Sequence, residues 1–167
     1  SAPQIAITVS SADGYESYIM DDLKVTSDTA SASEANPVEV IKPNGKYTIR
    51  ASFEKDTLEF FNTAGAAEFL ITDEVTAHTG QRSLKVTNRM MSDGTMMIYF
   101  DKAAKDAKIN VSCWLRNEPG AESRGYTLQA IIPTGTGKKW PAISSTVMAT
   151  DSGWTQISGT IDCSQYK

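Results

Sequence analysis

The sequence predicts an all-β fold, a two-sheet antiparallel β-sandwich of the jelly-roll type. Eight segments of about 5–9 residues alternate apolar with polar side chains and are rich in β-branched residues, which is typical of half-buried strands. Clusters of Gly, Pro, Asn and Asp separate these segments. The one helical candidate, residues 57–70, has its apolar spacing interrupted by Gly65 and other small residues. Many short strands joined by regular turns favour two packed sheets.

The expected strands follow from these alternating segments in chain order. They are residues 4–9, 17–25, 46–53, 82–88, 95–100, 109–115, 126–132 and 155–161. Turn-forming sequences such as KPNGK (42–46) and PTGTGKK (133–139) separate them. Residues 57–70 are expected to be a loop followed by a strand. With 167 residues, the chain is predicted to form a single domain over 1–167.

Composition excludes several classes of partner. The formal net charge is -4 and no basic stripe is present, so we expect no nucleic-acid partner. No run of eighteen apolar residues exists, so we expect no membrane insertion. Cys113 and Cys163 have no zinc-type spacing. Cys113 shares its parity with Ile109 and Val111 and is predicted to be a buried thiol, with a single disulfide as the alternative.

The chain divides into a leading strand pair and a larger body. Residues 5–25 form the pair, residues 26–36 (TSDTASASEAN) are a polar linker loop, and residues 37–167 are the main body. A lone two-stranded unit is marginal in water, so residues 5–25 are expected to dock on a sheet supplied by the rest of the chain.

From Phe53 to Asp162 the sequence resembles the family 22 and family 4 carbohydrate-binding modules found beside xylanases. SFE, AHTGQRSLKVTNR, INVSCWLRN and GWTQISGTI occur in that family's order and spacing. The family ends on a strand pair with a YIDD signature, whereas here YIMDD lies within residues 5–25. The resemblance therefore implies a circular permutation that moves the last two strands to the front. The alternative is a chain that spans two tandem modules.

Asp21 is the main candidate for a metal ligand. Strand parity groups it with Leu23 and Val25 on a core-facing side, where a carboxylate is costly unless it is paired or bound to a metal. The resemblance implies a structural Ca²⁺ held by Asp21, Glu54 and the backbone near Gln81. The alternative is that Asp21 and its acidic neighbour protect an edge strand against aggregation.

Two tryptophans are candidates for stacking against sugar rings. Trp140 falls where family 22 modules carry a ligand-stacking Tyr, although packing under a loop would also explain it. Alternation in residues 109–115 places Trp114 on the polar face together with Arg116, either as a ligand platform or covered by a loop.

Further candidates would supply hydrogen bonds or additional surface. Tyr99 and Gln129 are predicted to reach the groove, and Arg89 matches a family basic position that a salt bridge would also explain. Two departures weaken the likeness. The family's principal Trp is replaced by MMSDGTMM (90–97), and Thr8 and Ser10 stand where its penultimate strand has Tyr and Glu. The groove therefore uses other aromatics, or the xylan specificity has changed.

The resemblance implies a non-catalytic module that binds xylan or a related β-linked plant-wall polysaccharide. Its covalently linked partner would be a glycoside hydrolase such as an endo-xylanase, in an extracellular or cell-surface setting. One alternative is a structural or protein-contact jelly-roll domain of a secreted enzyme. A hydrolase is less well supported, because His78 is the only histidine and no Glu lies in mid-strand among groove-facing aromatics.

Overall fold

The computed structural model describes residues 4–11, 15–27, 40–41, 47–55, 67–90, 96–99 and 108–165. Within these ranges nearly every regular element is a strand, and the only helical element is the short 3₁₀ turn η3 (Cys163–Gln165). The predicted all-β sandwich is therefore confirmed. No helix in the described part is long and apolar enough to cross a membrane. Residues 28–39 of the expected linker and body, and residues 57–66, lie outside the described residues.

The smaller sheet, sheet A, contains five antiparallel strands. Four of them lie in the order β10-β9-β1-β7, and β11 also pairs with β9. The strands are β1 (Gln4–Ser10), β7 (Met96–Tyr99), β9 (Arg124–Thr134), β10 (Gly137–Lys139) and β11 (Val147–Ala149).

The larger sheet, sheet B, contains seven antiparallel strands in the order β12-β8-β2-β4-β3, with β6 and then β5 branching from β2. The long strand β2 pairs with β8 along one side, and on its other side first with β6 and then with β4. The strands are β2 (Tyr15–Ser27), β3 (Val40–Ile41), β4 (Tyr47–Ala51), β5 (Glu68–Thr72), β6 (Ser83–Met90), β8 (Lys108–Arg116) and β12 (Thr155–Asp162).

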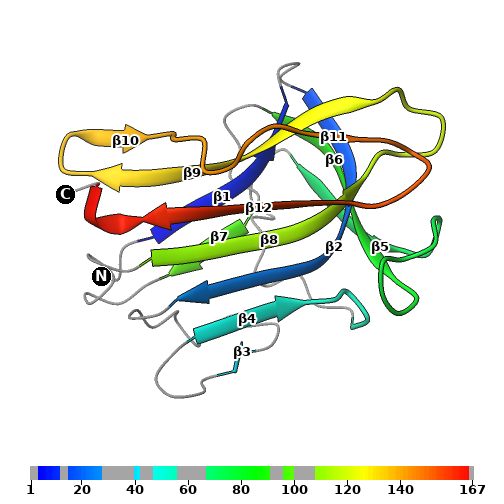
Figure 1. Cartoon of the computed structure of the whole chain (residues 1–167), viewed down its shortest axis with the longest axis horizontal. Coiled ribbons are helices and arrows are strands. Elements are labelled where there is room, and N and C mark those ends of the chain that lie inside the picture. The colour runs from blue at the N-terminus through cyan, green and yellow to red at the C-terminus, as the bar shows by residue number, and fades with distance from the viewer. Residues whose placement is uncertain are drawn as a thin grey trace.

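The first two strands of the chain are interior strands, one in each sheet. β1 lies between β9 and β7, and β2 lies between β8 and β4, as the two blue strands of Figure 1 show. Both therefore hydrogen-bond on two sides to later segments of the same chain. A strand paired on both sides presents no open edge to another molecule.

The core lies between the two sheets and follows the alternation seen in the sequence. In β8 the burial pattern alternates along the whole strand, with Ile109, Val111, Cys113 and Leu115 facing inward. Cys113 is a free thiol, and burial raises its pKa to about 12, so it stays protonated and inert. The side chain of Cys163 lies outside the described residues.

One feature of β2 overturns the predicted parity. Between Asp21 and Lys24 the register against β8 gains a residue, which is a β-bulge, and Asp22 at its centre has φ +48°. Met20 and Leu23 both pack into the core as a result. Asp21 therefore lies on the outer face of sheet B, and the prediction that it shares a core-facing side with Leu23 and Val25 is wrong.

Candidate functional site

Residues 73–82, here called the covering segment, lie against the outer face of sheet B. The indole nitrogen of Trp154 donates to the carbonyl of Thr76 at 2.9 Å. Lys85 of β6 pairs with Glu74 at 3.0 Å and with Glu118 at 3.3 Å. Lys85 of β6 and Trp154, which directly precedes β12, therefore bind the segment at two points along its length.

Asp21 anchors the middle of the covering segment. Its side chain is fully buried, and its Oδ2 accepts hydrogen bonds from the backbone amides of His78 at 2.9 Å and Thr79 at 3.2 Å. Its Oδ1 accepts from the amide of Asp22 at 2.8 Å. Burial raises the pKa of Asp21 to about 6, although these hydrogen bonds act in the opposite direction. β2 is an interior strand, so the edge-protection role does not apply.

Asp22 and His78 make the side-chain half of this contact. His78 Nδ1 lies 2.6 Å from Asp22 Oδ2, and the Thr79 hydroxyl donates to the same carboxylate at 2.7 and 2.8 Å. This hydroxyl therefore bonds to Asp22 and not to the imidazole. The cluster lacks the nucleophile-to-base hydrogen bond that a catalytic triad requires.

The ring of His78 also covers Trp114. The two rings stack with centroids 3.9 Å apart and an interplanar angle of 17°. Trp154 meets His78 edge-on at 6.2 Å. One face of Trp114 is thus occupied by the covering segment.

Glu54 anchors the end of the covering segment. Its Oε1 accepts from the amides of Gln81 and Arg82, each at 3.0 Å. Gly80, with φ +69°, lies so close to Glu54 that an added Cβ would collide with the carboxylate. The structure therefore brings Asp21, Glu54 and Gln81 to one turn.

These residues fit a calcium ion in part. Asp21 and Glu54 supply the hard carboxylate oxygens that Ca²⁺ prefers, and a carboxylate oxygen that accepts an amide keeps further lone pairs. However, the turn presents N–H groups to both carboxylates, and the described residues contain no group of three or more acidic, His or Cys side chains placed so that it could hold a metal ion. The turn is thus held by hydrogen bonds to protein groups.

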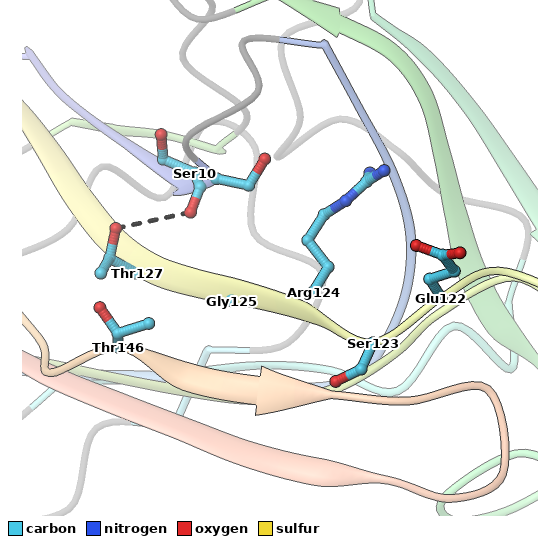
Figure 2. Close-up of a pocket in the computed structure, with 8 residues that line it drawn as sticks. Ser10, Glu122, Ser123, Arg124, Gly125, Thr127 and Thr146 are labelled. Atoms are coloured by element: carbon cyan, nitrogen blue, oxygen red, sulfur yellow. Dashed lines mark hydrogen bonds between the residues drawn. The ribbon is translucent and has the colours of Figure 1, made fainter.

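A polar hollow of about 570 Å³ lies at one end of the outer face of sheet A. Figure 2 shows Ser10 and Thr127 at one side of it, where the Thr127 hydroxyl donates to the Ser10 carbonyl at 3.4 Å, and Arg124 and Glu122 at the other. Ser10 and Thr127 are register partners on β1 and β9. The hollow therefore offers hydroxyl, guanidinium and carboxylate groups together.

Trp140 stands farther along the same sheet. Gln129 faces outward like Thr127, two residues away on β9, and its Nε2 donates to the Trp140 carbonyl at 3.0 Å. An isolated bridge between Gln129 and Ala142 fixes the chain beside it. The Trp140 side chain is 53% exposed, which is unusual for a tryptophan.

No family model, curated protein or solved structure matches this chain. The function therefore has to be inferred from the two faces of the sandwich and from the residues on them.

The structure divides the predicted sugar-binding residues between the two sheets. Gln129 and Tyr99 lie on strands of sheet A and Trp140 directly follows β10 of that sheet, whereas Trp114, Arg116 and Arg89 lie on strands of sheet B. The side chains of Tyr99 and Arg89 lie outside the described residues. Trp114 therefore lies on sheet B, whereas Trp140 lies beside sheet A.

Several site residues were not predicted from the sequence, for different reasons. Thr127 alternates with core residues just as Gln129 does, so the same signal could have found it. Arg124 and Glu122 lie in a turn sequence that carries no periodic pattern. The partners of His78 depend on the bulge in β2, which the sequence does not reveal.

Proposed function

We propose that this chain is a non-catalytic carbohydrate-binding module whose binding surface is the outer face of sheet A. The observation that carries the proposal is the half-exposed Trp140, held by Gln129 on the strand that also lines the polar hollow. Trp140 supplies an aromatic platform and the hollow supplies convergent polar groups, and small-molecule sites usually combine these two features.

The chemistry of this face suits a chain of sugar rings. The flat π-surface of Trp140 would take the C–H face of one pyranose ring. Thr127, Arg124 and Glu122 can donate and accept hydrogen bonds with the hydroxyls of a neighbouring ring. Together they favour a β-linked polysaccharide such as xylan, bound with a modest Kd of about 1 μM to 1 mM.

Trp114 would have a different role in this account. Because its ring stacks on His78, we infer that it supports the covering segment and does not contact sugar. Arg116 lies two residues away on the same strand, β8, and so lies outside the proposed binding surface on sheet A.

The proposed biological role is to keep an attached enzyme close to its polysaccharide substrate. Tethered to a glycoside hydrolase outside the cell, the module would raise the local concentration of substrate around the catalytic domain.

The experiment is affinity electrophoresis in gels that contain xylan, β-glucan or mannan. Trp140→Ala should weaken retardation by about 5- to 150-fold in apparent Kd, if stacking of a sugar on the ring contributes about 1–3 kcal/mol, as stacking of a nucleic-acid base on an aromatic side chain does. Leu70→Ala, which truncates another exposed apolar side chain on sheet B, is the matched control and should bind like wild type. If no polysaccharide changes the mobility of the wild-type protein, the structural or protein-contact role is favoured.

We also propose that Ca²⁺ binds at Asp21 and Glu54. The support is that two carboxylates, one fully buried, reach the same turn, and a cation would offset their charge. Chelation should then lower the Tm of wild type but leave Glu54→Gln unchanged. Equal Tm values for wild type with calcium and with chelator would show that the hydrogen bonds alone hold the turn.

A further inference from the structure

The outer face of sheet B has a second half, which lies beyond the bulge in β2 from the contacts of Asp21 and Asp22 with the covering segment. Here four strands run side by side in the order β12-β8-β2-β4. Their register aligns outward-facing residues in two cross-strand rows. The first row is Ser158, Ser112, Lys24 and Arg50, and the second includes Thr160, Asn110 and Thr26.

The rows are polar throughout and contain no aromatic residue. Lys24, Asn110, Ser158 and Thr160 are exposed, and their strand neighbours Val25 and Val111 face the core. Adjacent strands lie about 4.8 Å apart and outward residues recur about every 6.8 Å along a strand. The Thr160 hydroxyl donates to Asn110 Oδ1 at 2.8 Å, which orders the second row.

Lys24 and Arg50 carry the charge of this surface. They are direct register partners on β2 and β4, so two cations stand opposite each other on one face. Like charges in this position destabilise a sheet. Both are exposed, and neither forms an ion pair or hydrogen bond with any residue that the structure describes.

A hollow of about 580 Å³ joins the two rows to a neighbouring segment. It is lined by Lys24, Thr26, Asn110 and Ser112 on the sheet, and by Ser144 and Ser145 beside β12. Its lining supplies hydroxyl, amide and ammonium groups. An anionic ligand bearing many hydroxyls would therefore find complementary charge and hydrogen-bond partners here.

We propose that this surface binds an acidic polysaccharide, with uronate carboxylates held by Lys24 and Arg50 and sugar hydroxyls held by the Ser, Thr and Asn rows. Arg and Lys bind carboxylates through charge-assisted hydrogen bonds, which suits two cations that form no ion pair with any residue in the described part of the chain. The surface lies on the other sheet from Trp140 and works without stacking. It extends the carbohydrate-binding proposal to a second ligand class and does not depend on the groove of sheet A.

The test uses the full chain and polygalacturonate at low ionic strength, measured by titration calorimetry. Both cations are changed together, because each exposed ion pair contributes little on its own. The double variant Lys24→Gln/Arg50→Gln should weaken binding by about tenfold. Its control, Lys138→Gln/Lys139→Gln, removes the same net charge from β10 and should bind like wild type. The Tm of the Lys24/Arg50 variant should not fall, since a like-charge pair is removed.

Three outcomes would overturn the proposal. Unchanged affinity of the Lys24/Arg50 variant for polygalacturonate would exclude this surface as the binding site. An equal loss of affinity in the Lys138/Lys139 variant would show that only the net charge of the protein matters. If a single-stranded oligonucleotide bound as tightly as polygalacturonate and also depended on Lys24, the surface would bind polyanions in general and not acidic polysaccharides specifically. Trp140→Ala, by contrast, should bind polygalacturonate like wild type. A failure of the proposed function on sheet A would be detected separately, by titration with neutral xylo-oligosaccharides.

Discussion

Asp21 is a buried carboxylate on the outer side of a sheet, where it replaces water with three backbone amides. Those hydrogen bonds favour the charged form, but burial outweighs them and raises the pKa to about 6. The carboxylate of Asp22 faces it and adds repulsion, and the His78 ring binds that second carboxylate. Burial and the neighbouring charge of Asp22 therefore both oppose the ionisation of Asp21.

This arrangement predicts a specific pH dependence of stability in the presence of chelator. The pKa of Asp21 rises from 3.8 to about 6 on folding, so its contribution to stability is complete below about pH 4 and is lost as the pH rises through about 6. Relative to wild type, Asp21→Asn should gain up to about 3 kcal/mol of unfolding free energy between pH 4 and pH 7.

Urea unfolding at several pH values measures this difference. Asp73→Asn, an exposed carboxylate of the same covering segment, controls for the loss of one negative charge. A difference between Asp21→Asn and wild type that stays constant from pH 4 to pH 7 would rule out the raised pKa.

At the scale of elements, the bulge in β2 and the covering segment form one unit. The extra residue turns Asp21 outward and gives Asp22 a left-handed backbone, which aims both carboxylates at residues 78–79. Glu54 repeats the contact at the amides of residues 81–82. Two carboxylate anchors thus fix a segment with little regular structure of its own.

The end of this segment depends on Gly80. Gly80→Ala should destabilise the protein by about 2–4 kcal/mol, because it adds left-handed strain and displaces Glu54 from two amides. Gly120→Ala is the matched control, with φ +84° but open space around the added Cβ, so only the strain of about 1–2 kcal/mol applies. Equal losses for the two variants in urea unfolding would mean that Glu54 does not hold the turn.

The alternation of apolar and polar residues predicted some strands well. It failed where contacts between residues far apart in the sequence determine the position of a side chain. Alternation in β8 gave the inward set from Ile109 to Leu115 correctly, because an interior strand without a bulge keeps its period of two. The same reasoning failed at Asp21, since nothing in YIMDD signals an inserted residue. It also left the role of Trp114 open, because the ring that covers it comes from residues far away in the sequence.

At the scale of the whole molecule, the sandwich separates its functions by face. Sheet A carries Trp140 and the hollow at Ser10 and Thr127, while one half of sheet B is covered around Trp114. The leading strands make this division possible, because β1 supplies one wall of the hollow and β2 supplies the anchors of the covering segment.

One titration tests this division most directly. The three tryptophans give three indole N–H signals in a ¹H–¹⁵N correlation spectrum, which a neutral xylo-oligosaccharide would perturb only where it binds. The account predicts that the Trp140 signal shifts together with the amides of residues 127–131, while the signals of Trp114 and Trp154 stay in place. A spectrum in which the Trp114 or Trp154 signal shifts and that of Trp140 does not, or in which none of the three shifts, would contradict it.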